Sequence, residues 1–293
     1  MFSLLSTLLL SLSSINNTQN NIDFINNHSK DLPYKVSINQ FINREYINEF
    51  YNNTMKIIMS NNNNTDKLDN IVNVPHSIDW RKYDAVSSVK NQLECGSCWA
   101  FSAVESVEGA WSIKYDKLYN LSEQELIDCS ESYGNQGCDG GSMDLAFDYI
   151  IDNGLCNNIS YPYIADSNYQ CNNNTCDKVV KLKNYKDVHK NNEHVLKKAT
   201  SINPISVAIQ GNKRSFQLYD SGIYNDYDCG FDLDHGVLVV GYGYDELYDL
   251  DYWIVKNSWG NKWGENGYIR IERNINDSRG LCGIAMDASY PIV

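Results

Sequence analysis

Gln92-Leu93-Glu94-Cys95-Gly96-Ser97-Cys98-Trp99-Ala100-Phe101 is the stretch of this 293-residue chain that decides its fold. It opens a segment, Cys98 to Tyr115, in which apolar or small residues recur at i, i+3, i+4 spacing: Ala100, Ala103, Val104, Val107, Ala110 and Trp111. That spacing predicts a helix that begins at Cys98 and buries one stripe. A thiol at a helix N-terminus faces unpaired N–H groups and the positive end of the helix dipole, which favour the nucleophilic thiolate. Cys98 is therefore a candidate nucleophile.

The pair Cys95-x-x-Cys98 also admits three other interpretations. It could be a thioredoxin-type redox pair or half of a zinc site, or Cys98 could be an inert buried thiol. A redox pair calls for a preceding strand in a βαβ unit, and a zinc site calls for a second Cys/His pair at close spacing. The sequence offers neither. The inert thiol stays open on this motif alone.

A cysteine nucleophile needs a base, and among the five histidines His235 is the informative one. It stands in Leu233-Asp234-His235-Gly236-Val237, at the mouth of an apolar strand. A lone histidine at a strand end is usually a surface residue. Here a second motif supplies the partners that a catalytic histidine needs: Trp253-Ile254-Val255-Lys256-Asn257-Ser258-Trp259-Gly260. The Asn257 carbonyl can accept a hydrogen bond from the imidazole, and Trp259 can cover that bond from water.

The remaining patterning predicts a helical half followed by a strand-rich half. Ser122-Glu123-Gln124-Glu125 resembles a capping box with Ser122 as N-cap and Glu125 at N3, and a further helix is expected over 143–151. Short runs rich in Val, Ile and Tyr, bounded by Gly or Asp, predict strands over 205–210, 236–241, 252–256 and 267–272. Helices followed by strands indicate an α+β fold with two lobes.

Composition narrows the class of protein. The chain is 42% hydrophobic, enough for a sizeable core, and its net charge of −13 would repel nucleic acid and anionic lipid. Residues 1–15 carry an apolar stretch that is too short to span a membrane but fits a signal peptide; the alternative is an ordinary buried N-terminal helix. No later segment is long and apolar enough for a membrane anchor.

Nine cysteines suit an oxidising compartment, with four disulfides and one free thiol. Eight glycosylation sequons support secretion modestly, because the chain is rich in Asn: those starting at Asn16, Asn27, Asn52, Asn63, Asn120, Asn158, Asn173 and Asn276. All nine cysteines follow a composition change near Val74-Pro75, where we place the start of a mature domain. The Asn-rich tract 61–64, which precedes this boundary, is typical of a solvated linker that proteases can cleave.

Three motifs carry a family resemblance: the stretch around Cys98, Asp234-His235-Gly236-Val237, and Asn257-Ser258-Trp259-Gly260. In this order they resemble the signatures of papain and cathepsin L, and the similarity covers roughly residues 75–293. The resemblance implies a cysteine endopeptidase that needs no cofactor or metal. Its helical lobe (about 84–187) and β-barrel-like lobe (about 188–286) would flank a cleft that holds Cys98 and His235.

The resemblance also implies a role for each catalytic residue. Cys98 and His235 would form a thiolate–imidazolium pair, and Asn257 would orient the imidazole. The Gln92 side-chain amide and the Cys98 backbone N–H would form the oxyanion hole. Peptide hydrolysis would pass through a thioester on Cys98, with His235 first as acid and then as base.

Substrate contacts follow from the same resemblance. The matching positions are Gly140, Gly141, Met143, Ala208, Leu233, Asp234, Trp259 and Asp287. An apolar S2 pocket would favour Leu, Phe or Val at P2, the residue before the one whose carbonyl is attacked. Asp287 at the pocket floor could accept Arg or Lys there; the alternative is an ordinary solvated C-terminal aspartate. The short stretch from Cys129 to Cys138 lacks paired histidines, which favours an endopeptidase over a dipeptidase.

The family pattern pairs six of the remaining cysteines and leaves a fourth pair as a hypothesis: Cys95–Cys138, Cys129–Cys171, Cys229–Cys282 and the hypothetical Cys156–Cys176. Leu93 departs from the family, which usually has Gly there. The prosegment, 16–73, resembles the family's in Asn21-x-x-x-Ile25-x-x-His28 and in a strand over 34–41. The first half of the family's pro-helix motif is missing, which implies one of two alternatives: weak autoinhibition, or a start of the sequence that is wrongly assigned.

Several expectations concern partners and location. Peptide and protein substrates, the chain's own prosegment and cystatin-like inhibitors are the expected partners, and the protein is expected to be a monomer. The destination is the secretory pathway, ending in a lysosome or vacuole or outside the cell. The rival function is a catalytically inactive homologue that acts as a binding glycoprotein. It is disfavoured because Cys98, His235, Asn257 and Gln92 are all present.

Overall fold

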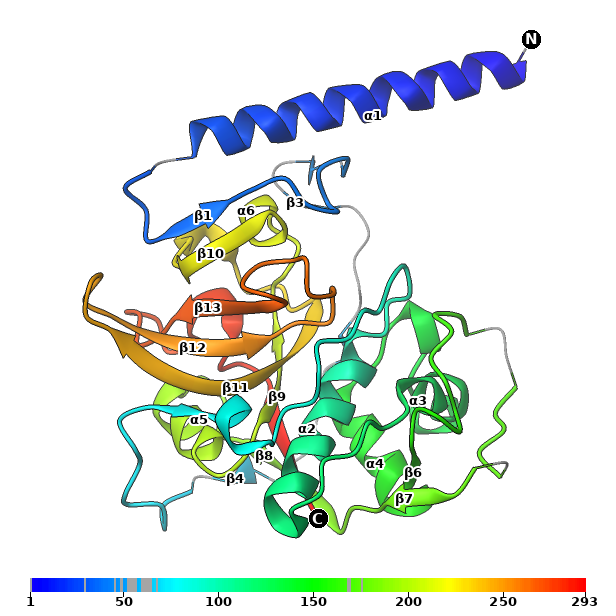
Figure 1. Ribbon diagram of the computed structural model, residues 1–293, viewed down its shortest axis with the longest axis vertical. Helices are drawn as coiled ribbons and strands as arrows, with labels where there is room; N and C mark the ends of the chain where they lie inside the picture. Colours follow the sequence, from blue (N-terminus) through cyan, green and yellow to red (C-terminus); the bar gives the residue numbers. More distant parts are fainter. Residues whose placement is uncertain are drawn as a thin grey trace.

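The computed structural model describes the chain except residues 1, 29, 45, 48–49, 52–56, 59–64, 67, 168–169 and 175. A helical lobe and a β lobe lie side by side, and a long N-terminal helix lies above the β lobe (Figure 1). Among the described residues, no helix combines the length and apolar character needed to cross a membrane. The expected linker at 61–64 lies outside the described residues.

The helical lobe contains the three helices that the sequence predicts. They are α2 (Cys98–Tyr115), α3 (Glu123–Cys129) and α4 (Met143–Asn153), accompanied by η2 (Glu131–Tyr133), η3 (Gly137–Asp139) and the hairpin of β6 (Leu155–Cys156) and β7 (Lys178–Val180). The Ser122 hydroxyl caps α3 by accepting the Glu125 backbone N–H at 3.0 Å. Helix α2 has the predicted bounds, but it is buried on nearly all sides rather than along one stripe. The reason is its place between the two lobes.

Small side chains let the lobes approach α2 closely. The Ser102 hydroxyl donates to the Val237 carbonyl at 2.7 Å, and the Ser106 hydroxyl donates to the Pro204 carbonyl at 2.9 Å. A Cβ on Gly109 would lie 2.7 Å from the Pro204 ring, so this crossing requires glycine. Each lobe has its own apolar core, and α2 belongs to the core of the helical lobe.

The β lobe is built on one sheet, with strand order β1-β10-β13-β12-β11-β9-β14-β8-β4 and β5 paired to β11. The strands are β1 (Tyr34–Val36), β4 (Thr65–Asp66), β5 (Ile78–Asp79), β8 (Asn184–Val188), β9 (Ile205–Ile209), β10 (Tyr219–Tyr224), β11 (His235–Asp245), β12 (Leu250–Lys256), β13 (Tyr268–Glu272) and β14 (Ala288–Ile292). Shorter elements complete the fold: α5 (Glu193–Thr200), α6 (Arg214–Gln217), η1 (Trp80–Tyr83), η4 (Tyr227–Cys229), η5 (Leu281–Gly283) and the hairpin of β2 (Tyr46–Ile47) and β3 (Phe50–Tyr51).

All four predicted strands are present as β9, β11, β12 and β13. The sheet also extends beyond the range expected for the β lobe. Residues 78–79 pair with β11, and 288–292 pair with β8 and β9. The sheet therefore receives strands from both ends of the expected mature domain.

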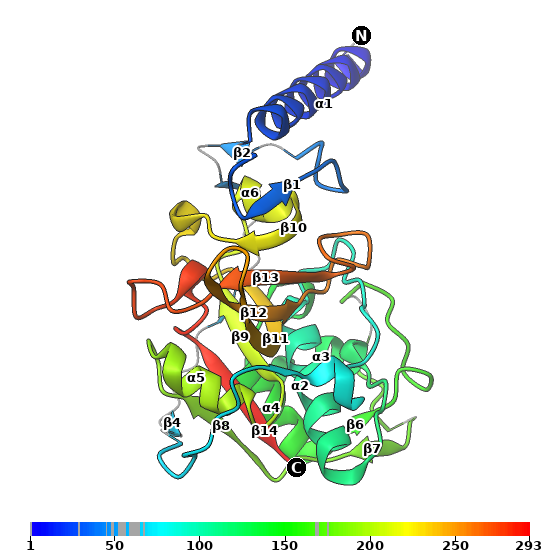
Figure 2. The ribbon, with the colours of Figure 1, turned by 60° about the vertical axis from the view of Figure 1, so that its left-hand side comes forward.

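The N-terminal segment docks on the outer edge of the β lobe. Helix α1 (Phe2–Asn27) runs without a break across the expected boundary at residue 15. Strand β1 pairs antiparallel with β10, and Figure 2 shows it lying between α1 and β10. The Tyr34 side chain is buried against Tyr224, with ring centroids 4.9 Å apart. The strand ends at Val36, earlier than predicted, and the Asn21 amide then donates to the carbonyls of Ile42 and Arg44.

Candidate active site

Cys98 is the first residue of α2, and the loop before it is tied down on both sides. Cys95 forms a disulfide with Cys138, and the Gly96 N–H donates to the Cys138 carbonyl at 2.9 Å. Leu93 has a φ of +55°, the left-handed conformation that glycine adopts most easily, so the backbone keeps the shape that suits the family's glycine although this chain has leucine. Cys98 is the free cysteine and is only 1% exposed.

His235 begins β11, and Asn257 directly follows β12, the neighbouring antiparallel strand. The His235 Nε2 and the Asn257 Oδ1 are 2.7 Å apart. Trp259 stacks on the imidazole with centroids 4.5 Å apart and an interplanar angle of 22°. The other ring nitrogen, Nδ1, is buried and has no hydrogen-bonding partner among the described residues. Asn257 and Trp259 thus hold the imidazole through one nitrogen and one face.

Gly236 brings the two lobes together at this point. A Cβ there would lie 3.1 Å from the Cys98 carbonyl oxygen, so β11 approaches the start of α2 only because residue 236 has no side chain. His235, the preceding residue, is consequently held beside the first turn of α2.

Gln92 is held by the strand end that carries Asn257. Its backbone N–H donates to the Ser258 carbonyl at 2.9 Å, and its side-chain Oε1 accepts from the Ser258 hydroxyl at 2.7 Å. Its Nε2 donates to the Cys95 carbonyl at 2.9 Å. The amide is therefore aligned towards the loop that ends in Cys98. Sequence reasoning missed Ser258, although it lies inside the Asn257 motif.

Burial sets the protonation of the two central groups. It raises the pKa of the Cys98 thiol to about 12; the Gly236 N–H and the N–H groups of the first turn of α2 oppose the rise, and the nearby Asp234 carboxyl adds to it. Burial lowers the pKa of His235 to about 4, and the hydrogen bond that the imidazole donates to the Asn257 Oδ1 opposes this fall. In this form burial therefore acts against the ionised state of both groups, and on the thiol it opposes the effect of the helix terminus.

The remaining substrate-contact positions gather near this centre. Gly140 follows η3 and precedes Gly141, where a Cβ would lie 2.6 Å from both the Trp99 ring and the Asn135 Oδ1. Met143 at the start of α4, Ala208 in β9 and Leu233 belong to one apolar cluster with Cys98. Asp234 is buried and accepts the Gly211 N–H at 2.6 Å.

A residue of the expected prosegment occupies this region. Ile57 forms a parallel bridge with Gly141, and the Ile58 N–H donates to the Gly141 carbonyl at 2.9 Å. The Ile57 side chain is 9% exposed and packs in the cluster of Met143, Ala208 and Leu233. A segment of the same chain thus pairs with Gly141, one of the expected substrate-contact positions. No pattern in the sequence marked Ile57.

Asp287 is not the solvated aspartate of the alternative interpretation, since it is only 8% exposed. Its carbonyl accepts the Ala208 N–H at 2.9 Å, which puts it next to the apolar cluster. Its carboxylate contacts the Lys190 ammonium at 3.2 Å. Burial and the neighbouring Asp144 raise the pKa of Asp287 to about 6, while Lys190 opposes the rise. Lys190 was not anticipated from the sequence.

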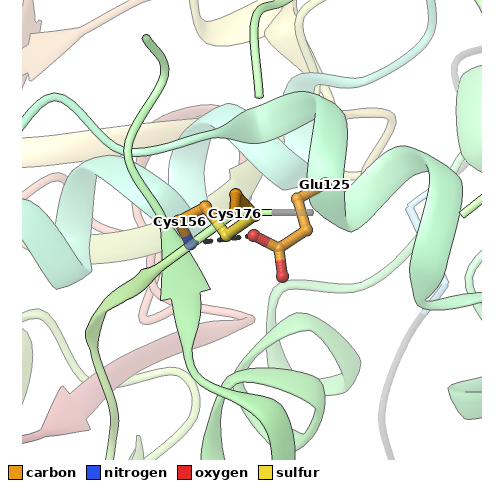
Figure 3. A group of neighbouring side chains, drawn as sticks. All are labelled: Glu125, Cys156 and Cys176. Carbon is orange, nitrogen blue, oxygen red and sulfur yellow. Dashed lines mark hydrogen bonds between the residues drawn. A yellow bond between two sulfur atoms is a disulfide. The ribbon is translucent and has the colours of Figure 1, made fainter. Parts of the chain in front are cut away.

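The structure joins eight cysteines in four disulfides: Cys95–Cys138, Cys129–Cys171, Cys156–Cys176 and Cys229–Cys282. Figure 3 shows Glu125 beside the third of these, with one carboxylate oxygen accepting the Cys156 N–H at 2.8 Å. Glu125 also contacts the Lys178 ammonium and the Tyr149 hydroxyl, so it braces the lobe instead of closing a capping box. The trio of Glu125 and two sulfurs offers no thiolate to a metal, because both sulfurs are in the disulfide.

Comparison with known proteins agrees with this geometry. Residues 74–292 match the family described as papain family cysteine protease. The chain is 47% identical over 281 residues to probable cysteine protease RD21B of Arabidopsis thaliana, which covers 94% of this chain and 59% of that protein. It is 46% identical over 284 residues to thiol protease SEN102 of Hemerocallis sp., covering 93% of this chain and 78% of that protein.

Among solved structures, the proform of the ragweed pollen cysteine protease Amb a 11 superposes with a TM-score of 0.85 and 36% identity, over 96% of this chain and 88% of that one. The chain thus spans about three fifths of RD21B and most of the ragweed proform. It belongs to the papain family of cysteine proteases.

Proposed function

We propose that this chain is the precursor of a cysteine endopeptidase in which Cys98 is the nucleophile. One observation carries the proposal: the free thiol at the start of α2 belongs to a residue that packs against Gly236, directly after His235. Asn257 fixes His235, and among the described residues its buried Nδ1 has no hydrogen-bonding partner. The inactive-homologue alternative lacks support, because the nucleophile, the base, the orienting amide and Gln92 are all intact.

In the proposed reaction, His235 Nδ1 takes the Cys98 proton and the sulfur attacks the peptide carbonyl carbon. The carbonyl oxygen becomes an oxyanion, which accepts hydrogen bonds from the Gln92 amide and the Cys98 backbone N–H. The imidazolium then protonates the leaving amine, and a thioester remains on Cys98. Water hydrolyses the thioester with His235 as general base, which restores the thiol.

We propose that the prosegment, within 16–73, keeps the precursor silent. Two features support this role. Ile57 forms a parallel bridge with the backbone of Gly141, and burial raises the pKa of the Cys98 thiol, which favours its protonated form. Removal of the segment would return water to the cleft and lower the cost of the ion pair. The expected mature domain then begins near residue 74, after release of a signal peptide over 1–15.

The apolar cluster around Ile57 supports a preference for apolar P2 residues. For a basic P2 residue, the Asp287 carboxylate would have to exchange Lys190 for the substrate cation. We therefore expect Asp287→Ala to slow the cleavage of substrates with Arg at P2 much more than of substrates with Leu at P2, and Lys190→Gln to raise the ratio of Arg-substrate to Leu-substrate cleavage. Equal effects on both substrates in steady-state assays would refute this part of the proposal.

Peptides and proteins are the proposed substrates, and the protein acts as a monomer that cystatin-like proteins can inhibit. Cleavage within chains is favoured because the described stretch between Cys129 and Cys138 forms only two short 3₁₀ helices. The four disulfides support passage through the secretory pathway, to a lysosome or vacuole or to the outside.

Replacement of the nucleophile tests the proposed function. Cys98→Ala should abolish hydrolysis of peptide substrates while leaving the circular dichroism spectrum and the unfolding temperature of the protein near those of the wild type. Retained turnover in the purified variant would remove Cys98 from the mechanism.

A further inference from the structure

The hydroxyl of Tyr163 links the two ends of the loop that precedes α2. It donates to the Gln92 carbonyl at 2.7 Å and lies 2.9 Å from the Ser97 hydroxyl. A carbonyl can only accept, so the single Tyr163 proton goes to Gln92 and the Ser97 hydroxyl donates to Tyr163. The result is one directed chain, from Ser97 through Tyr163 to Gln92.

Both ends of this chain adjoin an oxyanion donor. Gln92 carries the side-chain amide, and Ser97 immediately precedes Cys98, whose backbone N–H is the second donor. The β lobe fixes Gln92 through Ser258, as described above. Tyr163 fixes the same residue from the helical lobe, through the Gln92 backbone carbonyl.

Tyr163 is itself held firmly. Its ring packs edge-on against Phe101 in the first turns of α2, with centroids 4.9 Å apart. Two residues earlier, the Tyr161 carbonyl accepts the Ser122 hydroxyl at 2.7 Å and the Tyr161 hydroxyl donates to Asp128 at 2.8 Å. Burial raises the pKa of Tyr163 to about 12, so its hydroxyl remains a donor throughout the working range of a peptidase.

We propose that Tyr163 is a positioning residue for the oxyanion hole, an inference that rests on the proposed peptidase function. It touches neither substrate nor thiol and acts by setting the separation between the Gln92 amide and the Cys98 N–H. These donors matter most when the carbonyl oxygen has become an oxyanion, since only then must both lie at hydrogen-bonding distance from one charged atom. Tyr163 therefore affects the rate of the chemical step and leaves ground-state binding alone.

Tyr163→Phe tests this role, because it removes one oxygen and keeps the ring on Phe101. Tyr161→Phe is the matched control from the same Tyr-Pro-Tyr segment: it also loses a tyrosine hydroxyl hydrogen bond, to Asp128, remote from Gln92. Both variants are made as the full chain and matured. We expect Tyr163→Phe to lower kcat on the order of tenfold, with KM within about twofold of wild type, as for a small misplacement of a catalytic group.

Two inhibitors separate positioning from general damage. A peptide aldehyde forms a hemithioacetal, whose oxygen occupies the oxyanion hole. With an epoxysuccinyl peptide the Cys98 sulfur instead attacks a ring carbon, the epoxide C–O bond breaks and the ring oxygen takes a proton, so no tetrahedral carbonyl oxyanion is formed. Tyr163→Phe should weaken binding of the aldehyde by the same factor by which kcat falls, and should leave the rate of alkylation by the epoxide unchanged. Tyr161→Phe should change neither the aldehyde affinity nor the alkylation rate.

Three outcomes would overturn the proposal: equal kcat and aldehyde affinity in the two variants, a parallel loss of aldehyde and epoxide reactivity, or a rise in KM alone. If Tyr163→Phe does not fold, Ser97→Ala breaks the same chain at its other end and is judged by the same readouts. A wild-type protein that neither cleaves peptides nor reacts with the epoxide would instead refute the proposed function, before any variant is compared.

Discussion

Lys256 and Glu105 form an ion pair across the two lobes that offers a quantitative test of how the fold is held together. Lys256 ends β12 just before Asn257 and is 0% exposed, whereas Glu105 lies in α2 and is 3% exposed. The ammonium and carboxylate are 2.7 Å apart, and the ammonium also donates to the Ser87 hydroxyl at 3.1 Å. Burial raises the pKa of Glu105, and Lys256 opposes the rise.

Lys256→Met would leave the Glu105 carboxylate buried without this partner. The same pocket already holds Glu108 and Glu123, both paired with Lys90 at 2.7 and 2.5 Å. Removing one member of a buried pair costs about 3–5 kcal/mol, which for a domain of this size lowers the unfolding temperature on the order of 10 °C. The double variant Lys256→Met/Glu105→Leu should recover most of the loss, because no charge is then left unpaired.

Urea unfolding of the matured protein, in a Cys98→Ala background that prevents autolysis, measures these free energies. Lys262→Met, an exposed lysine, is the control and should stay within about 0.5 kcal/mol. A Lys256→Met loss below about 1 kcal/mol, or a double variant no more stable than the single, would refute the reasoning.

Three further predictions concern activity and maturation. Gln92→Ala should lower kcat on the order of 10²-fold with little change in KM, measured by steady-state peptide hydrolysis; a change confined to KM would contradict its oxyanion role. Burial lowers the pKa of His235 from 6.5 to about 4 in the closed form, so that form is fully stable above about pH 6.5 and loses stability as the pH falls towards 4. Maturation of the precursor, followed by mass spectrometry, should therefore become faster as the pH falls through this range. A maturation rate that does not change with pH would contradict this prediction. Ile57→Ala should speed Cys98 alkylation in the uncleaved precursor by at least tenfold, whereas Ile38→Ala, at a 65% exposed position, should not.

Much of the helical lobe could be predicted because local signals suffice there. The bounds of α2 follow from its spacing, and Ser122 caps α3 as expected. Helix α5 escaped prediction because tertiary contacts stabilise it: the Glu193 carboxylate accepts the Trp253 indole N–H at 2.8 Å, from a residue far along the chain. Strand β14 escaped because Ser289 and Pro291 interrupt the alternation that marks a strand.

The proposed catalytic residues could be picked out because each stands in a motif of its own, and their roles stay a prediction. The residues that support or occupy the site could not, because only the folded chain brings them there. Ile57 reaches Gly141 from the expected prosegment, Lys190 reaches Asp287 from outside every motif, and Tyr163 reaches back to Gln92. The raised pKa of the Cys98 thiol was also beyond sequence reasoning, since it comes from burial, which opposes the effect of the helix terminus.

The identity of the nucleophile is tested most directly by labelling the matured protein with an epoxysuccinyl peptide and locating the adduct by mass spectrometry. We predict a single adduct on Cys98, with peptidase activity lost in proportion to labelling. The same spectra should show a mature N-terminus near residue 74. An adduct on another residue, or full activity in protein labelled at Cys98, would contradict the account.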